Sequence, residues 1–177
     1  ASATEIALKM SFHYWRNAGR PGKRRFVTLT NSYHGETLGA LAVGHVDLYR
    51  EIYQPLLMDV ISVPSPDCYA REPGEDWESH SRRMFAPMEE TLARHADEVC
   101  AVIVEPLQRV LLPEPGFLQA LREVTKKHGI VLVFDEIVTG FRIAWGGAQE
   151  RYGVVPDLAC YGKAISGGFP LAAVVGN

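Results

Sequence analysis

Apolar residues in this chain follow two patterns, one of unbroken runs and one of regular spacing. Short apolar runs, several of them rich in β-branched residues, occupy residues 26–30, 60–63, 101–104, 131–134, 158–161 and 171–175. Apolar or small residues recur in the manner of helices over residues 4–18, 36–43, 79–97 and 117–128. The runs predict strands and the spaced segments predict helices. Because the runs show little alternation with polar residues, we expect these strands to be buried on both faces.

Polar, small and charged residues mark where these elements end. Thr4 is expected to cap the first helix, and Gly129 is expected just beyond the end of the last one. Residues 31–35 predict a polar turn after the first strand, and residues 68–77, rich in Pro, Gly and charge, predict a surface loop. The basic residues within 20–25 are expected to form a solvated turn.

Strands that alternate with helices predict an α/β fold, with a mostly parallel sheet and helices on both of its faces. No repeat, low-complexity segment or linker divides the 177 residues, which suit a single domain. The chain opens almost directly into a helical pattern without a starting methionine and stops just after an apolar run. We therefore expect residues 1–177 to be part of a larger domain.

Composition argues against some classes of protein, but it does not indicate which kind of enzyme this chain would be. The chain is 47% hydrophobic and 22% charged, as is usual for soluble globular proteins. Its net charge of -3, with both signs mixed along the chain, argues against nucleic acid or an anionic membrane as partner. No apolar run approaches the roughly 20 residues of a membrane span. Cys68, Cys100 and Cys160 lack metal-ligand spacing, and an odd count fits reduced thiols in a cytoplasmic protein.

Candidate chemical groups follow four of the predicted strands. The carboxyl ends of parallel strands meet at one edge of a sheet, and open α/β sheets bind their ligands there. We therefore expect these groups to face a common ligand. They are Tyr33 and His34 after the first strand, Glu105 after residues 101–104, Asp135 and Glu136 after residues 131–134, and Lys163 after residues 158–161.

Lys163 and Asp135 are the most informative of these groups. The neighbours of Lys163 are apolar or small, so loss of hydration would favour a neutral amine that forms a Schiff base with an aldehyde. An ordinary surface lysine is the alternative. A carboxylate at the end of a buried strand needs a cationic partner, and a pyridinium nitrogen would be one for Asp135. A salt bridge or a helix cap is the alternative, and Glu136 competes for the same role.

The remaining groups have weaker individual signals. Tyr33 could lay its ring against a flat aromatic cofactor, or it could be an ordinary core or surface tyrosine. His34 could donate a hydrogen bond to a ligand, although a histidine in a turn is more often structural. Glu105 could orient a polar group, or it could accept a hydrogen bond from a backbone amide.

Together these motifs resemble those of the class III (ω-amino acid type) aminotransferases, which are pyridoxal 5′-phosphate enzymes of fold type I. The matching pieces occur in family order and cover nearly the whole chain. They are residues 31–35, 104–106, 134–142 and 156–168, which include Asp-Glu and Gly-Lys motifs at the family spacing.

The resemblance implies a role for each candidate. Lys163 is similar to the lysine that holds the cofactor as a Schiff base and later shuttles a proton, and Asp135 to the acid that keeps the pyridine nitrogen protonated. Cofactor contacts are also expected from the ring of Tyr33, with its neighbour His34, and from Ile137. Tyr33 and Glu105 are the expected substrate contacts.

Two further residues fall at a family position that binds phosphate. Ala1 and Ser2 lie where the Gly-Ser/Thr turn of the family enters a helix, so backbone amides would hold the cofactor phosphate there. The resemblance also implies a homodimer and small-molecule substrates, an amino donor and an oxo acceptor. The family's N-terminal segment and C-terminal small domain are expected to be absent from this partial large domain.

Two subfamilies share the resemblance. Residues 1 to about 107 are similar to the adenosylmethionine-8-amino-7-oxononanoate aminotransferases of biotin synthesis, whereas the chain from about residue 108 onward departs from them, at residues 108–115 and 140–149. The second of these segments resembles glutamate-1-semialdehyde aminomutases. The chain is either a divergent member or a combination of two origins, and a cofactor-binding core without catalysis is a third interpretation. A nicotinamide-dependent oxidoreductase is disfavoured, because no G-x-G-x-x-G follows residues 26–30.

Overall fold

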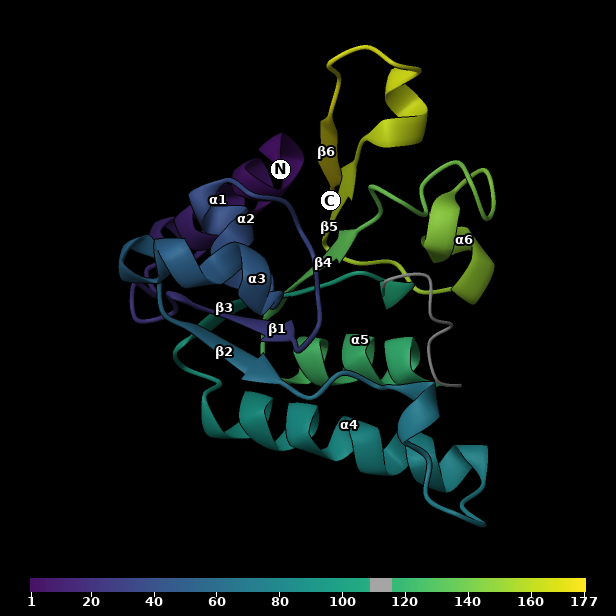
Figure 1. The fold of residues 1–177 in the computed structure, drawn as a ribbon. Coiled ribbons are helices and arrows are strands. Elements are labelled where there is room, and N and C mark those ends of the chain that lie inside the picture. Colours follow the sequence, from purple (N-terminus) through teal and green to yellow (C-terminus); the bar gives the residue numbers. More distant parts are fainter. Residues whose placement is uncertain (109–115) are drawn as a thin grey trace.

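The computed structural model describes residues 1–108 and 116–177, which build one sheet with helices on either side (Figure 1). The sheet has six strands in the order β2-β1-β3-β4-β5-β6. The first five in this order pair in parallel, and β6 runs antiparallel beside β5. The mostly parallel α/β fold is confirmed. The strands are β1 (Arg25–Leu29), β2 (Val60–Val63), β3 (Val99–Val104), β4 (Val131–Asp135), β5 (Leu158–Tyr161) and β6 (Ala173–Gly176).

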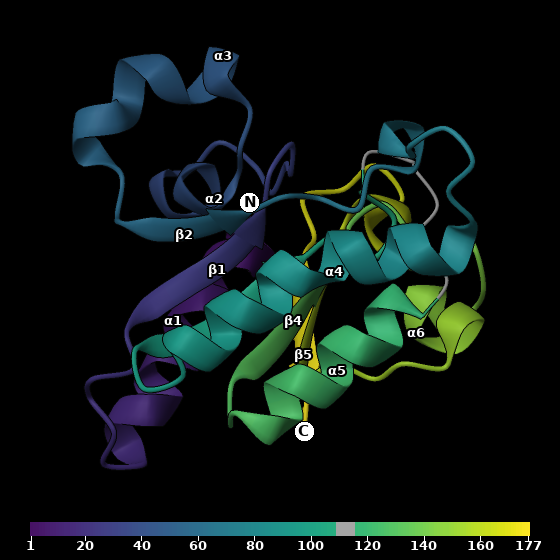
Figure 2. The ribbon, with the colours of Figure 1, turned by 90° about the horizontal axis from the view of Figure 1, so that it is seen from below.

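Helices cover both faces of the sheet, as the sequence predicted (Figure 2). Side chains of α4 and α5 pack on one face, and those of α1 and α2 pack on the other. The helices are α1 (Ser2–Asn17), α2 (Leu38–Val43), α3 (Asp47–Arg50), α4 (Trp77–Arg94), α5 (Phe117–Lys127) and α6 (Gly147–Tyr152). Among the described residues, 3-10 turns span Glu51–Leu56, Cys68–Ala70 and Lys163–Ser166.

The central strand β3 explains why the apolar runs lack alternation. All six of its residues are buried. Val102 and Val104 join the core under α4 and α5, while Ala101 and Ile103 join the core under α1 and α2. Successive side chains of a strand point to opposite faces, so a strand covered on both sides must be apolar throughout. Each fully buried Val or Ile stabilises the fold by about 1.5–3 kcal/mol.

The helix boundaries differ from the predicted ones in instructive ways. α1 begins at Ser2 with Ala1 as its N-cap, so the expected Thr4 cap is wrong. The Thr4 hydroxyl instead donates to the His34 carbonyl at 3.1 Å. Gly129, with φ of 57°, follows α5 in the left-handed conformation, as predicted. α3 and α6 were not predicted, since each has too few residues to show a periodic apolar stripe.

The basic turn within residues 20–25 is not wholly solvated, because Lys23 is only 1% exposed. Its Nζ donates to the carbonyls of Ala96 and Val99, the latter at 3.1 Å, and lies 4.7 Å from the centroid of the Trp15 ring. Burial, reinforced by the positive charge of Arg20, lowers the pKa of Lys23. The two carbonyls and the ring offset the cost of burying this ammonium group.

Two other expectations concern cysteines and membranes. Cys100 and Cys160 are free and buried. Burial raises the pKa of the Cys100 thiol to about 12, so it is an unreactive core residue. Within residues 1–108 and 116–177, no helix is both long and apolar enough to cross a membrane.

Candidate active site

The predicted polar groups lie at the carboxyl edge of the parallel strands, where β1, β3, β4 and β5 end (Figure 1). The pairing of Val104 with Phe134 brings Glu105 and Asp135 to the same level of the sheet. Asp135 itself pairs with Cys160 of β5, three residues before Lys163. Topology therefore gathers residues that are far apart in the sequence at one edge.

Asp135 is a buried carboxylate, 5% exposed, at the end of β4. Its Oδ2 lies 2.7 Å from Nδ1 of His34, and its Oδ1 accepts the Ile137 N–H at 3.1 Å. A carboxylate only accepts hydrogen bonds, so Nδ1 of His34 is the donor. The Nε2 atom of His34 is buried without a partner among the described residues. Because a carboxylate offers about four lone pairs, Asp135 can still accept from a cationic ligand.

Glu136 does not compete with Asp135, because its carboxylate is already committed to the loop that follows β4. It is fully buried and accepts from the Thr139 hydroxyl at 2.5 Å and from the backbone amides of Ala148 at 2.7 Å and Gln149 at 3.1 Å. A Cβ atom on Gly147 would lie 2.4 Å from Oε2 of Glu136. Glu136 therefore folds the loop onto the first turn of α6.

Tyr33 is held at both its backbone and its hydroxyl group. Its N–H donates to Oε2 of Glu105 at 2.9 Å, and its hydroxyl donates to Oε1 of Glu36 at 3.0 Å. Partial burial and the hydrogen bond to Glu36 raise the pKa of Tyr33. The ring meets that of Tyr49 edge-on with 5.8 Å between the ring centroids, and the residue as a whole is 39% exposed, so a ligand can reach it. Glu105 thus accepts a backbone amide, which was the second of its two interpretations.

The amino end of α1 lies against the same turn. Ala1 and Ser2 are exposed, and the first hydrogen bond within the helix runs from the Glu5 N–H to the Ala1 carbonyl at 2.9 Å. The amides before Glu5 are therefore not used by the helix, and such an end favours anions. Gly35, with φ of 120°, packs so closely that an added Cβ would lie 2.8 Å from the Ala1 Cβ.

Lys163 departs from its prediction, because its side chain is exposed. β5 ends at Tyr161, and Lys163 opens a 3-10 turn that leaves the sheet, so the expected loss of hydration is not found. Its φ is 45°. The other described non-glycine residues with positive φ are Asn31 and Phe141, which lie in the loops after β1 and β4. Backbone strain of about 1–3 kcal/mol per residue is typical of functional loops.

Sequence reasoning missed the residues that support this edge. Two of these residues lie on α1: Thr4 bonds to His34, and Glu5 bonds to Thr37. The other two contact Tyr33: Glu36 accepts from its hydroxyl, and Tyr49 packs against its ring. Only Thr4 carried a signal, as a polar residue on the otherwise apolar face of a predicted helix. The others depend on contacts between elements.

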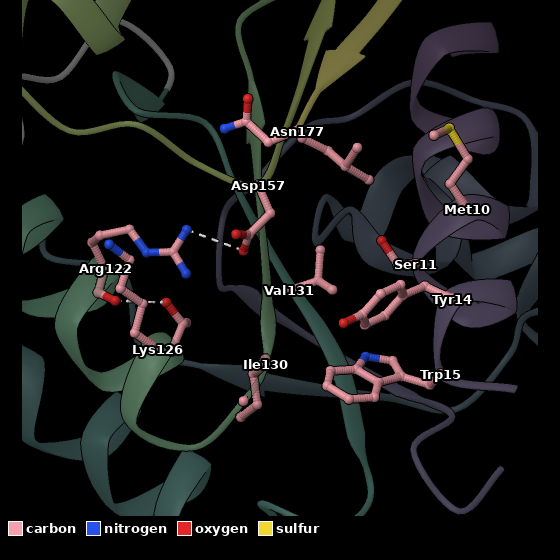
Figure 3. A pocket seen from close by; sticks show the side chains of 13 residues that line it. Met10, Ser11, Tyr14, Trp15, Arg122, Lys126, Ile130, Val131, Asp157 and Asn177 are labelled. Atoms are coloured by element: carbon pink, nitrogen blue, oxygen red, sulfur yellow. Dashed lines mark hydrogen bonds and ion pairs between the residues drawn. The ribbon is translucent and has the colours of Figure 1, made fainter. Parts of the chain in front are cut away.

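A cavity of about 370 Å³ lies at the opposite edge of the sheet, where β4 and β5 begin (Figure 3). Tyr14 and Trp15 of α1 form one wall, and Arg122 of α5 pairs with Asp157 at 3.0 Å on the other. None of the predicted site residues lines this cavity. The carboxyl edge is therefore the candidate active site.

Comparison with known proteins agrees with this geometry. The family model "Aminotransferase class-III" matches residues 1–177. An adenosylmethionine-8-amino-7-oxononanoate aminotransferase from Aquifex aeolicus (strain VF5) is 41% identical, over 99% of this chain and 40% of its own length. A glutamate-1-semialdehyde 2,1-aminomutase from Rhodopirellula baltica is 36% identical, over 99% of this chain and 37% of its own length.

A solved structure gives the same result for the fold. An amine transaminase from an uncultivated Pseudomonas species, in its pyridoxal-phosphate-bound form, matches with a TM-score of 0.92 and 36% identity, over 99% of this chain and 41% of that one. Each relative matches almost the whole of this chain rather than one half of it. The chain spans about 40% of the length of the curated relatives it matches. The resemblance seen in the sequence is confirmed, and the chain belongs to the class-III aminotransferase family.

Proposed function

We propose that this chain is the pyridoxal-phosphate-binding core of an aminotransferase. The observation that carries the proposal is the buried Asp135 carboxylate, which retains lone pairs beside the strand that leads to Lys163. Family membership supports the same cofactor. When bound, pyridoxal phosphate supplies an aldehyde carbon for attachment and a ring that withdraws electrons from the substrate.

Asp135 would face the ring nitrogen of the cofactor. Its negative charge favours a protonated nitrogen, and His34 and the Ile137 amide fix the direction of the carboxylate. Tyr33 would lie against the ring, and Ile137 would be its apolar neighbour. The first-turn amides of α1, next to Ala1 and Ser2, would hold the phosphate.

Lys163 would supply the reactive amine. Its Nζ would hold the cofactor in place, and as a free amine it would move a proton at the substrate α-carbon. The exposed amine and the glycines at 167 and 168 leave this group accessible. Glu105 would act on the substrate side by holding the Tyr33 backbone in place.

For the substrate, we favour the amino transfer that forms 7,8-diaminopelargonate in biotin synthesis. The support is the similarity to enzymes named for that reaction, at 41% and 37% identity in two examples. Amino transfer of the glutamate-1-semialdehyde type is the second candidate, supported by a 36% identical relative. A core that binds the cofactor without catalysis is the third, because the chain spans only about 40% of those relatives.

We also propose a cytoplasmic homodimer. Apolar side chains stand exposed along α3 and the turn that follows it, close to the candidate site through the Tyr33–Tyr49 contact. A second copy would cover this surface and shield it from water. The exposed residues are Leu48, Ile52, Tyr53, Leu56 and Met58. Light scattering of the protein and of an Ile52→Glu variant tests this point, since a stable dimer should dissociate in the variant.

The main test is covalent attachment of the cofactor. Purified protein is incubated with pyridoxal phosphate, scanned for the visible absorbance of a Schiff base, reduced with borohydride and mapped by peptide mass spectrometry. We expect a single label on Lys163. A protein that gains no absorbance band, or a label spread over surface lysines, would overturn the proposal.

A further inference from the structure

Glu5 reaches from the first turn of α1 to the start of α2. Its Oε1 accepts hydrogen bonds from the Thr37 hydroxyl at 2.6 Å and from the backbone amides of Gly39 at 2.7 Å and Ala40 at 3.1 Å. Thr37 is the N-cap of α2 but makes no side-chain cap of its own. A carboxylate from another helix therefore satisfies the amides that begin α2, and hydrogen bonds to a charged acceptor are stronger than neutral ones.

Gly39 makes room for this carboxylate. A Cβ atom at this position would lie 2.4 Å from Oε2 and 2.8 Å from Oε1 of Glu5. Unlike Gly35, it has no left-handed backbone to explain the glycine. The fit of Glu5 against Gly39 is therefore the structural reason for a glycine inside α2, where it would otherwise weaken the helix.

Residues 1–5 and 33–40 are joined at three successive points. Gly35 packs against Ala1, and the Thr4 hydroxyl donates to the His34 carbonyl. Glu5 then binds the start of α2. One side of this joint holds the α1 amides that the helix does not use, and the other carries Tyr33 and His34, the partner of Asp135.

We propose that Glu5 is a positioning residue for the cofactor, which locks the turn of residues 33–35 to the helix end that receives the phosphate. This inference rests on the proposed function, because it assigns the two sides of the joint to the ring and the phosphate of one ligand. Glu5 itself touches neither. Glu5 would fix the amino end of α1 and the turn of residues 33–35 relative to each other before the cofactor binds. Binding then does not carry the entropic cost of ordering them.

The test measures affinity for pyridoxal phosphate by titration, together with the circular dichroism of the bound cofactor, which reports how its ring is held. We expect Glu5→Ala to raise the Kd about tenfold, or about 1.4 kcal/mol, and to weaken the dichroism per bound cofactor. Glu5→Gln keeps an acceptor oxygen without the charge, and we expect a rise of about threefold, in line with the weaker neutral hydrogen bonds.

Gly39→Ala tests the same contact from its α2 side. It favours the helix but displaces the Glu5 carboxylate, so we expect it to raise the Kd as Glu5→Ala does. In the double variant, Gly39→Ala should add nothing further, because the carboxylate that it displaces is gone. If Glu5→Ala fails to fold, the Gly39→Ala result alone decides.

Glu75→Gln is the matched control for a general loss of stability. Glu75 also accepts several hydrogen bonds, from Arg83 and from the Glu72 amide, but lies in the loop before α4. We expect this variant to lower the melting temperature and leave the Kd unchanged. If wild-type protein takes up no cofactor, the proposed function fails. If wild-type protein binds it and the folded Glu5 and Gly39 variants bind equally tightly, with unchanged dichroism, only the positioning role is overturned.

Discussion

Two lysines at opposite edges of the sheet show how little burial alone says about function. Lys23, near the amino ends of β1 and β3, is buried under Trp15 and donates to two backbone carbonyls. Lys163, beyond the carboxyl end of β5, is exposed and begins a turn with a left-handed backbone. The buried amine is fully used by the fold. The side chain of the exposed one is accessible to a ligand, and its backbone has a positive φ.

The two edges differ in the same way. At the amino edge, Asp157 pairs with Arg122 and also accepts the Leu132 amide at 2.7 Å, so its charge is compensated inside the chain. At the carboxyl edge, Asp135 keeps unused lone pairs; within residues 1–108 and 116–177, Nε2 of His34 is buried without a partner, as is Nε of Arg122 at the amino edge. What distinguishes the candidate site is the carboxylate: Asp135 is buried, and among the described residues its only ion-pair partner is His34, so its charge is incompletely compensated by arginine or lysine.

Replacing Lys163 should have the largest effect. We expect Lys163→Ala to abolish borohydride-fixed labelling and to lower amino-transfer activity by about 10²- to 10⁴-fold, the usual contribution of a proton-transferring group. Stability should change by less than about 0.5 kcal/mol, because the side chain is exposed. Lys163→Arg is the matched control, which keeps the charge but cannot form the Schiff base. Activity retained in either variant would remove Lys163 from the mechanism.

Removing the charge of Asp135 tests the incomplete compensation directly. Asp135→Asn keeps the shape of the side chain, and we expect activity to fall by about 10²- to 10³-fold, as for other removed electrostatic contacts. The absorbance of bound pyridoxal phosphate should shift as its ring nitrogen loses its proton. Glu136→Gln is the contrasting variant, expected to lower thermal stability without that shift. A spectral shift in Glu136→Gln alone would reverse the assignment of the two acids.

At the amino edge, Lys23→Met should affect stability alone. We expect a loss of about 1–3 kcal/mol in the free energy of unfolding, because the carbonyls of Ala96 and Val99 lose their donor. Denaturant titration measures this loss, with Lys9→Met on the surface of α1 as the control. The affinity for pyridoxal phosphate should not change. A weakened affinity in Lys23→Met would show that the two edges are coupled.

The same lysine predicts a pH dependence. Burial and Arg20 lower the pKa of Lys23 from 10.5, so the unfolded chain still holds this proton where the folded chain has lost it. The free energy of unfolding contributed by Lys23 should therefore rise with pH between the lowered value and 10.5. Lys23→Met should remove that rise. An unchanged pH profile in the variant would contradict the lowered pKa.

The smallest effect is expected at Glu75, away from both edges. Hydrogen bonds from Arg83 and from the Glu72 amide lower its pKa from 4.5 to about 2. The folded chain therefore holds fewer protons than the unfolded chain in this interval, and the stability that Glu75 contributes is lost as pH falls from 4.5 toward 2. Thermal melts of Glu75→Gln should show a shallower acid limb than those of the unchanged protein. Parallel acid limbs would contradict this contribution.

Local pattern was sufficient for most of the fold. Unbroken apolar runs located the six strands to within a few residues. The expected burial on both faces holds for the central strand β3 but is wrong for the edge strands β2 and β6, which are only partly buried because each has a neighbour on one side alone. The turn of residues 31–35 and the end of α5 at Gly129 were also predicted, since both depend on local backbone chemistry. α3 and α6 were missed because helices of four and six residues are too short to show a period.

The sequence by itself determined which groups follow which strands, and the parallel order of the strands then placed Tyr33, Glu105, Asp135 and Lys163 at one edge. The family resemblance already favoured Asp135 over Glu136, and only the tertiary structure showed that these buried neighbours differ in what reaches them from other elements. The exposure of Lys163, the burial of Lys23 and the reach of Glu5 to α2 were decided in the same way. Contacts between segments that are distant in the sequence do not change the spacing of apolar residues along the chain. Each such hydrogen bond or buried side chain depends on where another element lies in the fold, so the sequence pattern does not predict it.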